Sequence, residues 1–123
     1  MSLPLTRLIM YVRDVQKLSR FYRTHFELSL VEEIGDDWVV LKAGTVELAL
    51  HRVGESYRDL PMSGAASNTK LVFTVETGLM DRREHFVKAG VAMRPLKRFD
   101  GFPYLMCDGE DPEGNVFQLL QLD

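Results

Sequence analysis

The sequence has few of the residues that mark several common protein classes. It contains a single cysteine, Cys107, so no disulfide framework can form within the chain. It has no long apolar run and no signal-like amino terminus, so we expect a cytoplasmic protein with no membrane partner. Its 15 basic residues are outnumbered by 18 acidic residues and form no basic run, so nucleic acid is not an expected partner either.

The chain does have enough apolar sequence for the core of one domain, because hydrophobic residues make up 46% of its 123 positions. Its most informative stretch is 111–121, where a turn around Pro112 and Gly114 leads directly into a strongly apolar strand. Gln118 is the polar interruption between Phe117 and Leu119. We therefore expect Gln118 to face a cavity or another polar side chain.

The first half of the chain has the pattern of a strand, a helix and three strands. Residues 6–12 are rich in bulky apolar side chains and predict a strand, and Asp14 is the expected N-cap of the helix that follows. Segments 28–33, 37–42 and 45–52 predict three short strands separated by turn signals. Apolar residues at helical spacing predict the buried face of the helix: Val15, Leu18, Phe21, Tyr22 and Phe26.

The second half repeats this order after a loop at 54–67. Residues 70–75 predict a strand, Thr77 is the expected cap of a helix reaching Ala89, and Gly90 is expected to end that helix. Segments 91–98, 104–108 and 115–122 predict three further strands. Cys107 lies in one of them and is expected to be a buried, unreactive thiol.

The two halves align as an internal repeat, because Arg7 and Lys70 open the first strands, Val12 and Val75 end them, and each pair is 63 residues apart. The prediction is a single α+β domain of two βαβββ modules, at about 4–53 and 68–123, that form one curved mixed sheet with the helices on its convex face. By strand alternation, Leu8, Met10 and Val12 should face the first helix, and Leu71, Phe73 and Val75 the second.

These features resemble one known superfamily. A Val-x-Asp step before a helix carrying Phe21-Tyr22, the doubled βαβββ order and the closing Asp-Pro-Glu-Gly-Asn-x-x-Gln strand are similar to the glyoxalase, bleomycin-resistance and extradiol-dioxygenase proteins, also called the vicinal oxygen chelate superfamily. The resemblance covers nearly the whole chain and implies a homodimer. It leaves the activity open, because the superfamily includes isomerases, dioxygenases, thiol transferases and metal-free drug-binding proteins.

The resemblance also implies where a metal site would lie. Metal-using members place His or Glu at inward positions on the opening and closing strands of each module, and here those positions carry Arg7, Lys70 and Gln118, with Glu47 as the nearest counterpart on the fourth strand. Arginine and protonated lysine have no lone pair to offer a cation. We therefore predict no metal and no other cofactor.

A ligand-binding cleft is predicted on the concave face instead, although no catalytic residue can be assigned. Two cations, Arg7 and Lys70, against one anion, Glu47, would give this cleft an excess positive charge that attracts an anion. Trp38 is the best candidate for stacking on a planar ligand, and core packing is the competing role of such aromatics. The full set of predicted ligand-binding residues is Arg7, Tyr11, Trp38, Glu47, His51, Lys70, Thr74, Tyr104 and Gln118.

Three functions are consistent with the predicted fold and cleft. The leading prediction is a metal-independent, glyoxalase-like protein that binds a small anionic or aromatic molecule. The second is an enzyme, a lyase or dioxygenase relative that recruits a metal through residues other than those aligned above. The third is a structural or regulatory dimerisation module. For the charged residues themselves, the alternatives to anion binding are structural ion pairs of Arg7 with Glu47 and of Lys70, and a catalytic role for Lys70.

Overall fold

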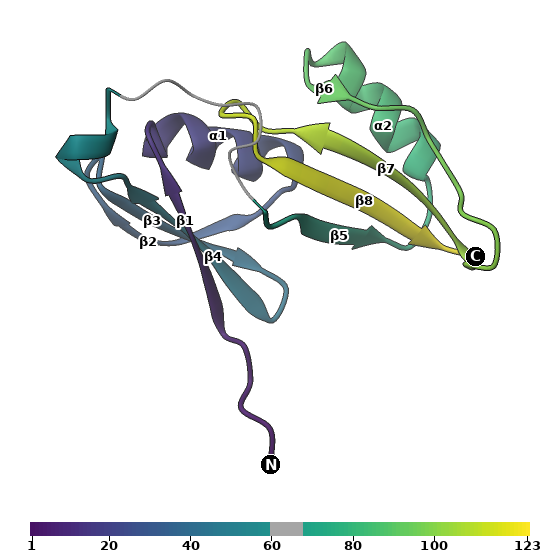
Figure 1. Ribbon diagram of the computed structural model, residues 1–123, viewed down its shortest axis with the longest axis horizontal. Coiled ribbons are helices and arrows are strands. Elements are labelled where there is room, and N and C mark those ends of the chain that lie inside the picture. Colours follow the sequence, from purple (N-terminus) through teal and green to yellow (C-terminus); the bar gives the residue numbers. More distant parts are fainter. Residues whose placement is uncertain (60–67) are drawn as a thin grey trace. The chain divides into compact units, whose positions relative to one another are not determined.

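The structure is a computed structural model that describes residues 1–59 and 68–123 (Figure 1). The chain divides into two compact units, Met1–Pro61 and Met62–Asp123, which we call module 1 and module 2. Most of the predicted loop at 54–67 lies outside the described residues, and its first part contains a short 3-10 helix, η1, at Glu55–Tyr57. No helix in the described part of the chain is long and apolar enough to span a membrane.

Module 1 has the predicted βαβββ order and forms one mixed sheet of four strands. Strand β1 pairs in parallel with β4, and the β4–β3 and β3–β2 pairs are antiparallel, which gives the order β1-β4-β3-β2. The elements are β1 (Arg7–Val12), α1 (Val15–His25), β2 (Ser29–Ile34), β3 (Trp38–Ala43) and β4 (Val46–Arg52).

Module 2 repeats this topology strand for strand. Its sheet order is β5-β8-β7-β6, with β5 and β8 parallel and the other pairs antiparallel. The predicted α+β class with two βαβββ modules is therefore confirmed, and each module carries its own four-stranded sheet. The elements are β5 (Leu71–Val75), α2 (Leu79–Lys88), β6 (Ala92–Met93), β7 (Tyr104–Glu110) and β8 (Val116–Leu122), drawn in green to yellow in Figure 1.

Helix α1 begins and packs as the sequence predicts. The Asp14 carboxylate accepts a hydrogen bond from the Lys17 N–H at 3.0 Å, so a side chain satisfies one of the free donors of the first turn. Val15, Leu18 and Tyr22 are almost fully buried. The helix packs against β3 and β4, so this apolar stripe covers one face of the sheet of module 1.

Helix α2 begins differently from the prediction. Its N-cap is Gly78, in the left-handed region at φ 77°, and not Thr77. The first free donor, the Leu79 N–H, is satisfied by the Gln121 side-chain oxygen of β8 at 2.9 Å, a partner 42 residues away that local sequence cannot reveal. Gly90 follows the helix at φ 86°, as expected for the residue that ends it.

The strand predicted at 91–98 is also wrong in extent, because β6 covers only Ala92–Met93. Pro95 has no N–H to donate to a ladder, so the strand stops before it. One isolated bridge, between Lys97 and Met106, resumes the contact with β7.

The faces of the opening strands agree with the predicted alternation. Arg7, Ile9 and Tyr11 are exposed, whereas Leu8 and Met10 are half-buried and Val12 is buried on the face that α1 covers. In β5, Val72 and Thr74 are exposed, and Leu71, Phe73 and Val75 are half-buried. We call the sheet face opposite the helix the open face of each module.

Candidate functional site: the two open faces

On the open face of module 1, the residues predicted to bind a ligand come from three neighbouring strands. Arg7 of β1 pairs with Glu47 of β4, and four residues further along the same ladder Tyr11 pairs with His51. His51 also pairs with Trp38 of β3. Because side chains alternate between the two faces of a strand, all five project from the same face.

The Arg7 side chain extends across this face and contacts Glu47 on β4 and Trp38 on β3. Its Nε and Nη2 donate to the Glu47 Oε1 at 3.1 and 2.8 Å, and its guanidinium carbon lies 5.6 Å from the centre of the Trp38 ring system. Ala49 and Val40, which pair with each other in the row between these residues, are fully buried although they belong to the open face. Through these two contacts Arg7 links β1 to both β4 and β3 on the open face.

The other end of the open face is a row of three rings. The Tyr11 and His51 ring centroids are 5.2 Å apart, and the His51 and Trp38 centroids are 5.7 Å apart with an interplanar angle of 81°. The Trp38 Nε1 donates to the Glu32 Oε2 at 3.1 Å, which fixes the indole in its plane. We call Tyr11, His51 and Trp38 the aromatic row.

The hydrogen bond of His51 determines which of its nitrogens remains available. Its Nδ1 lies 2.7 Å from the backbone carbonyl of Arg52, and a carbonyl can only accept, so Nδ1 carries a proton. In the neutral ring, Nε2 is then a hydrogen-bond acceptor. The aromatic row thus presents one polar atom that can accept from a ligand.

On the open face of module 2, the residues predicted to bind a ligand lie around a carboxylate that the sequence analysis did not include. Asp108 of β7 is 5% exposed. Its Oδ2 accepts from the Lys70 Nζ at 2.9 Å, and its Oδ1 accepts from the Gln118 Nε2 at 3.1 Å. The Arg94 Nη1 lies 3.6 Å from Oδ2 and also makes an ion pair with Glu110. We call Asp108, Lys70, Gln118, Arg94 and Glu110 the charged cluster.

The charged cluster keeps Asp108 ionised. Burial alone raises the pKa of this carboxyl, but the hydrogen bonds from Lys70 and Gln118, with the charges of Lys70 and Lys97, outweigh it, and the pKa lies below the ordinary 3.8. The neighbouring Cys107 is fully buried on the opposite face of the same strand, and burial raises the pKa of its thiol, while the charge of Arg83 opposes the rise. The thiol is thus protonated near neutral pH and is a poor nucleophile.

The sequence contained a signal for Asp108. The expectation that Gln118 meets another polar side chain is confirmed, and in the antiparallel ladder its direct partner is Asp108. Counting the β7–β8 pairs outward from the turn at 111–115 would have placed the two residues opposite each other.

Asp108 also removes the predicted excess of positive charge. Arg7 is paired with Glu47, and Lys70 is paired with Asp108, so each of these cations has its own carboxylate. The inference of two cations against one anion is therefore wrong, because it omitted one buried acid.

The remaining two predicted residues lie away from the charged cluster. Thr74 pairs with Leu120, and Tyr104 pairs with Leu122 at the far end of the β7–β8 ladder. Both share the open face of module 2 with Gln118, and the Tyr104 ring contacts Phe102 at a centroid distance of 5.8 Å. The structure thus joins five predicted residues in module 1 and Lys70 with Gln118 in module 2, and a single surface containing both groups stays a prediction.

The ladders also correct one internal alignment. If Arg7 is superposed on Lys70, then Ile9 corresponds to Val72, and their partners Ala49 and Gln118 correspond to each other. Glu47 is therefore two residues out of register with Gln118, not its counterpart. Aligning each strand separately by its sequence missed this shift, because only the strand pairing defines the register of one strand relative to its neighbour.

The side chains on the two open faces are not suited to coordinate the divalent cation that the resemblance implies. Glu47 already accepts two hydrogen bonds from Arg7, and both oxygens of Asp108 are taken by Lys70 and Gln118. In residues 1–59 and 68–123, no group of three His, Cys, Asp or Glu side chains could hold a metal ion. A cation here would have to displace the positive charge of Arg7 or Lys70.

Comparison with known proteins gives the fold a precedent. No protein-family model matches the sequence, and no curated protein matches it either. Among solved structures, lactoylglutathione lyase from Agrobacterium tumefaciens aligns over 96% of this chain and 92% of its own, with a TM-score of 0.76 and 18% sequence identity. The chain has the vicinal oxygen chelate fold.

Two further structures show how widely this vicinal oxygen chelate fold is shared. The fosfomycin resistance protein FosX from Listeria monocytogenes aligns over 100% of this chain and 94% of its own, with a TM-score of 0.73 and 15% identity. An integron cassette protein from the mobile metagenome of V. cholerae aligns over 100% of this chain and 98% of its own, with a TM-score of 0.76 and 20% identity. At these identities the likeness establishes the fold, and the function has to be argued from the residues.

Proposed function

We propose that this protein binds a planar, aromatic small molecule on the open face of module 1 without the help of a metal. The observation that carries the proposal is the aromatic row, in which Tyr11, His51 and Trp38 lie side by side on three paired strands. Tyr11 is 68% exposed, so a large part of this row is open to a ligand. Exposed rings fixed on a sheet offer an apolar surface with little conformational entropy to lose.

The rings are held in place before a ligand arrives. Glu32 fixes the Trp38 indole N–H, and the Arg7 guanidinium lies over the indole ring, so the indole has little freedom to turn. Preorganisation of this kind lowers the entropic cost of binding. If these three aromatic side chains only filled a core, their rings would be buried.

Two polar groups, the Arg7 guanidinium beside the row and the His51 Nε2 within it, determine which ligands fit. Arg7 uses two of its five N–H donors on Glu47, so it can also donate to a carboxylate of the ligand. The Nε2 of His51 can accept from a ligand hydroxyl or amine. We therefore propose an aromatic ligand with one acidic or hydroxyl substituent, in which stacking supplies most of the affinity.

Trp38 is the single tryptophan of the chain and reports directly on this face. The experiment is a titration with 4-nitrobenzoate, followed by quenching of the Trp38 emission and corrected with free N-acetyltryptophanamide. We expect saturable quenching, and 4-nitrobenzyl alcohol should bind more weakly because it lacks the carboxylate. Non-saturable quenching equal to that of the free indole would refute the proposal.

Two matched variants locate the site. Tyr11→Leu removes a ring from the aromatic row and should weaken binding about fivefold, whereas Tyr57→Leu removes a ring of similar exposure from η1 and should have no effect. An equal effect of the two substitutions would show that the probe binds elsewhere.

We also propose that the protein is a homodimer, which light scattering of the purified chain tests.

A further inference from the structure

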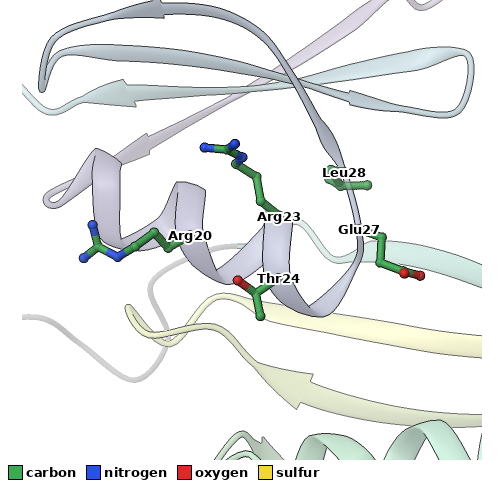
Figure 2. Close-up of a pocket in the computed structure, with 5 residues that line it drawn as sticks. All are labelled: Arg20, Arg23, Thr24, Glu27 and Leu28. Carbon is green, nitrogen blue, oxygen red and sulfur yellow. The ribbon is translucent and has the colours of Figure 1, made fainter.

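A second candidate binding site lies on helix α1, away from the residues of the open faces described above. The last two turns of α1 and the turn that follows them enclose an open hollow of about 340 Å³. Figure 2 shows the five side chains around it, which are Arg20, Arg23, Thr24, Glu27 and Leu28. This volume is at the lower end of the range of small-molecule sites.

The hollow is lined by hydrogen-bond donors on one side of the helix. Arg20, Arg23 and Thr24 are spaced three and four residues apart, so the helix carries them on one side. Within residues 1–59 and 68–123, neither guanidinium makes a hydrogen bond or an ion pair. Elsewhere in the same part of the chain, Arg7, Arg52, Arg94 and Arg98 all have carboxylate partners. The two arginines of the hollow differ from them in this respect.

The charge around the hollow is positive although the chain as a whole is not. Helix α1 contains Lys17, Arg20 and Arg23 and no acidic side chain, in a chain with a net charge of −3. Glu27 is the one acid of the lining, and Figure 2 shows its carboxylate pointing away from both guanidinium groups. Its backbone has φ 56°, the one positive value outside glycine in the described residues, and this turn directs the side chain away.

We propose that this hollow binds the phosphate group of a small phosphate monoester. Two guanidinium groups match the two negative charges of a monoester near neutral pH, and their planar N–H pairs match its oxygens. The Thr24 hydroxyl supplies a further donor, and Leu28 supplies an apolar wall for the group attached to the phosphate. The site is separate from the aromatic row, so it adds a second ligand to the proposed function.

The probe is phenyl phosphate, measured by isothermal titration calorimetry in a phosphate-free buffer at low salt. We expect saturable binding to wild-type protein, weaker binding of inorganic phosphate because it lacks the ring that would contact Leu28, and the weakest binding of singly charged benzoate. Benzoate binding as tightly as phenyl phosphate would overturn the assignment to a phosphate. A flat titration with phenyl phosphate would overturn the site itself.

Substitutions on one helix separate the site from general charge. Arg20→Gln and Arg23→Gln should each weaken phenyl phosphate binding about tenfold. Lys17→Gln removes the same charge from the same helix outside the hollow and should change binding less than twofold, an amount expected for a screened surface charge. Equal losses in all three variants would overturn the proposal, because they would show a diffuse attraction to the helix. The Trp38 titration with 4-nitrobenzoate should be unchanged in every variant.

Discussion

Lys70 and Asp108 form an ion pair across the open face of module 2, with the Lys70 Nζ 2.9 Å from the Asp108 Oδ2. The two ends of this pair differ in environment, since the lysine side chain is 43% exposed and the aspartate side chain only 6%. The lysine is therefore the solvent-facing partner of a buried carboxylate. Its removal leaves that carboxylate with Gln118 and the more distant Arg94 as its remaining partners.

Lys70→Met should destabilise the protein by about 1–3 kcal/mol, because the buried charge of Asp108 loses its nearest counter-charge. Urea unfolding at pH 7 measures the effect. The double variant Lys70→Met/Asp108→Asn should recover part of the loss, since the charge that needs compensation is then gone. Additive losses in the double variant would show that the two side chains do not act as a pair.

The stability of the protein should fall in acid partly because of Asp108. The pKa of this carboxyl is lower in the folded protein than its ordinary 3.8, so its stabilising contribution is complete above about pH 3.8 and is lost as the pH falls towards the folded value. Unfolding free energies measured between pH 2 and 6 test this. In Asp108→Asn, the decline below pH 4 should be shallower than in wild type, and an unchanged slope would contradict the assignment.

Gly109→Ala should destabilise module 2 by about 1–3 kcal/mol, because an added methyl group overpacks the core. A Cβ at this position would overlap the Met93 sulfur and the Phe117 ring on the helix-covered face of the sheet. Gly54→Ala is the matched control, since the nearest atom to its Cβ is 3.9 Å away. Chemical denaturation of both variants should show a loss only for Gly109→Ala.

Glu27→Gly should stabilise the protein by about 0.5–1 kcal/mol, because φ 56° is strained for glutamate and relaxed for glycine. Glu27→Gln keeps the strain and removes the charge, so it should have almost no effect on the unfolding free energy. If Gln stabilises as much as Gly, the cost at this position comes from the charge and not from the backbone.

The elements that the sequence predicted well are those whose signals are local. Asp14 caps α1, Gly90 ends α2, and the alternation in β1 exposes Arg7 and Tyr11, because each of these depends on neighbours within a few residues. The start of α2 was missed, since its first donor is satisfied by Gln121 from the far end of the module. The strand propensity of residues 91–98 overestimated the length of β6, because it took no account of the missing N–H of Pro95.

The candidate site was predicted in part for the same reason. Arg7, Glu47 and Trp38 were predicted to line one cleft, and the structure joins them on one face of module 1. Asp108 was not among the predicted ligand-binding residues, although it lies at the end of the strand predicted at 104–108, which continues to Glu110. Its burial depends on Lys70 and Gln118, which come from two other segments, so their mutual compensation becomes visible only when the strands are paired.

If the protein binds its ligand without a metal, chelation should leave the affinity unchanged. The Kd of 4-nitrobenzoate is determined from Trp38 emission on untagged protein, before and after exhaustive dialysis against EDTA, and again after addition of Zn²⁺ or Mn²⁺. We expect the same Kd in all samples, because Arg7 and the aromatic row form the site without a cation. Loss of binding after EDTA, with recovery on addition of either metal, would contradict it.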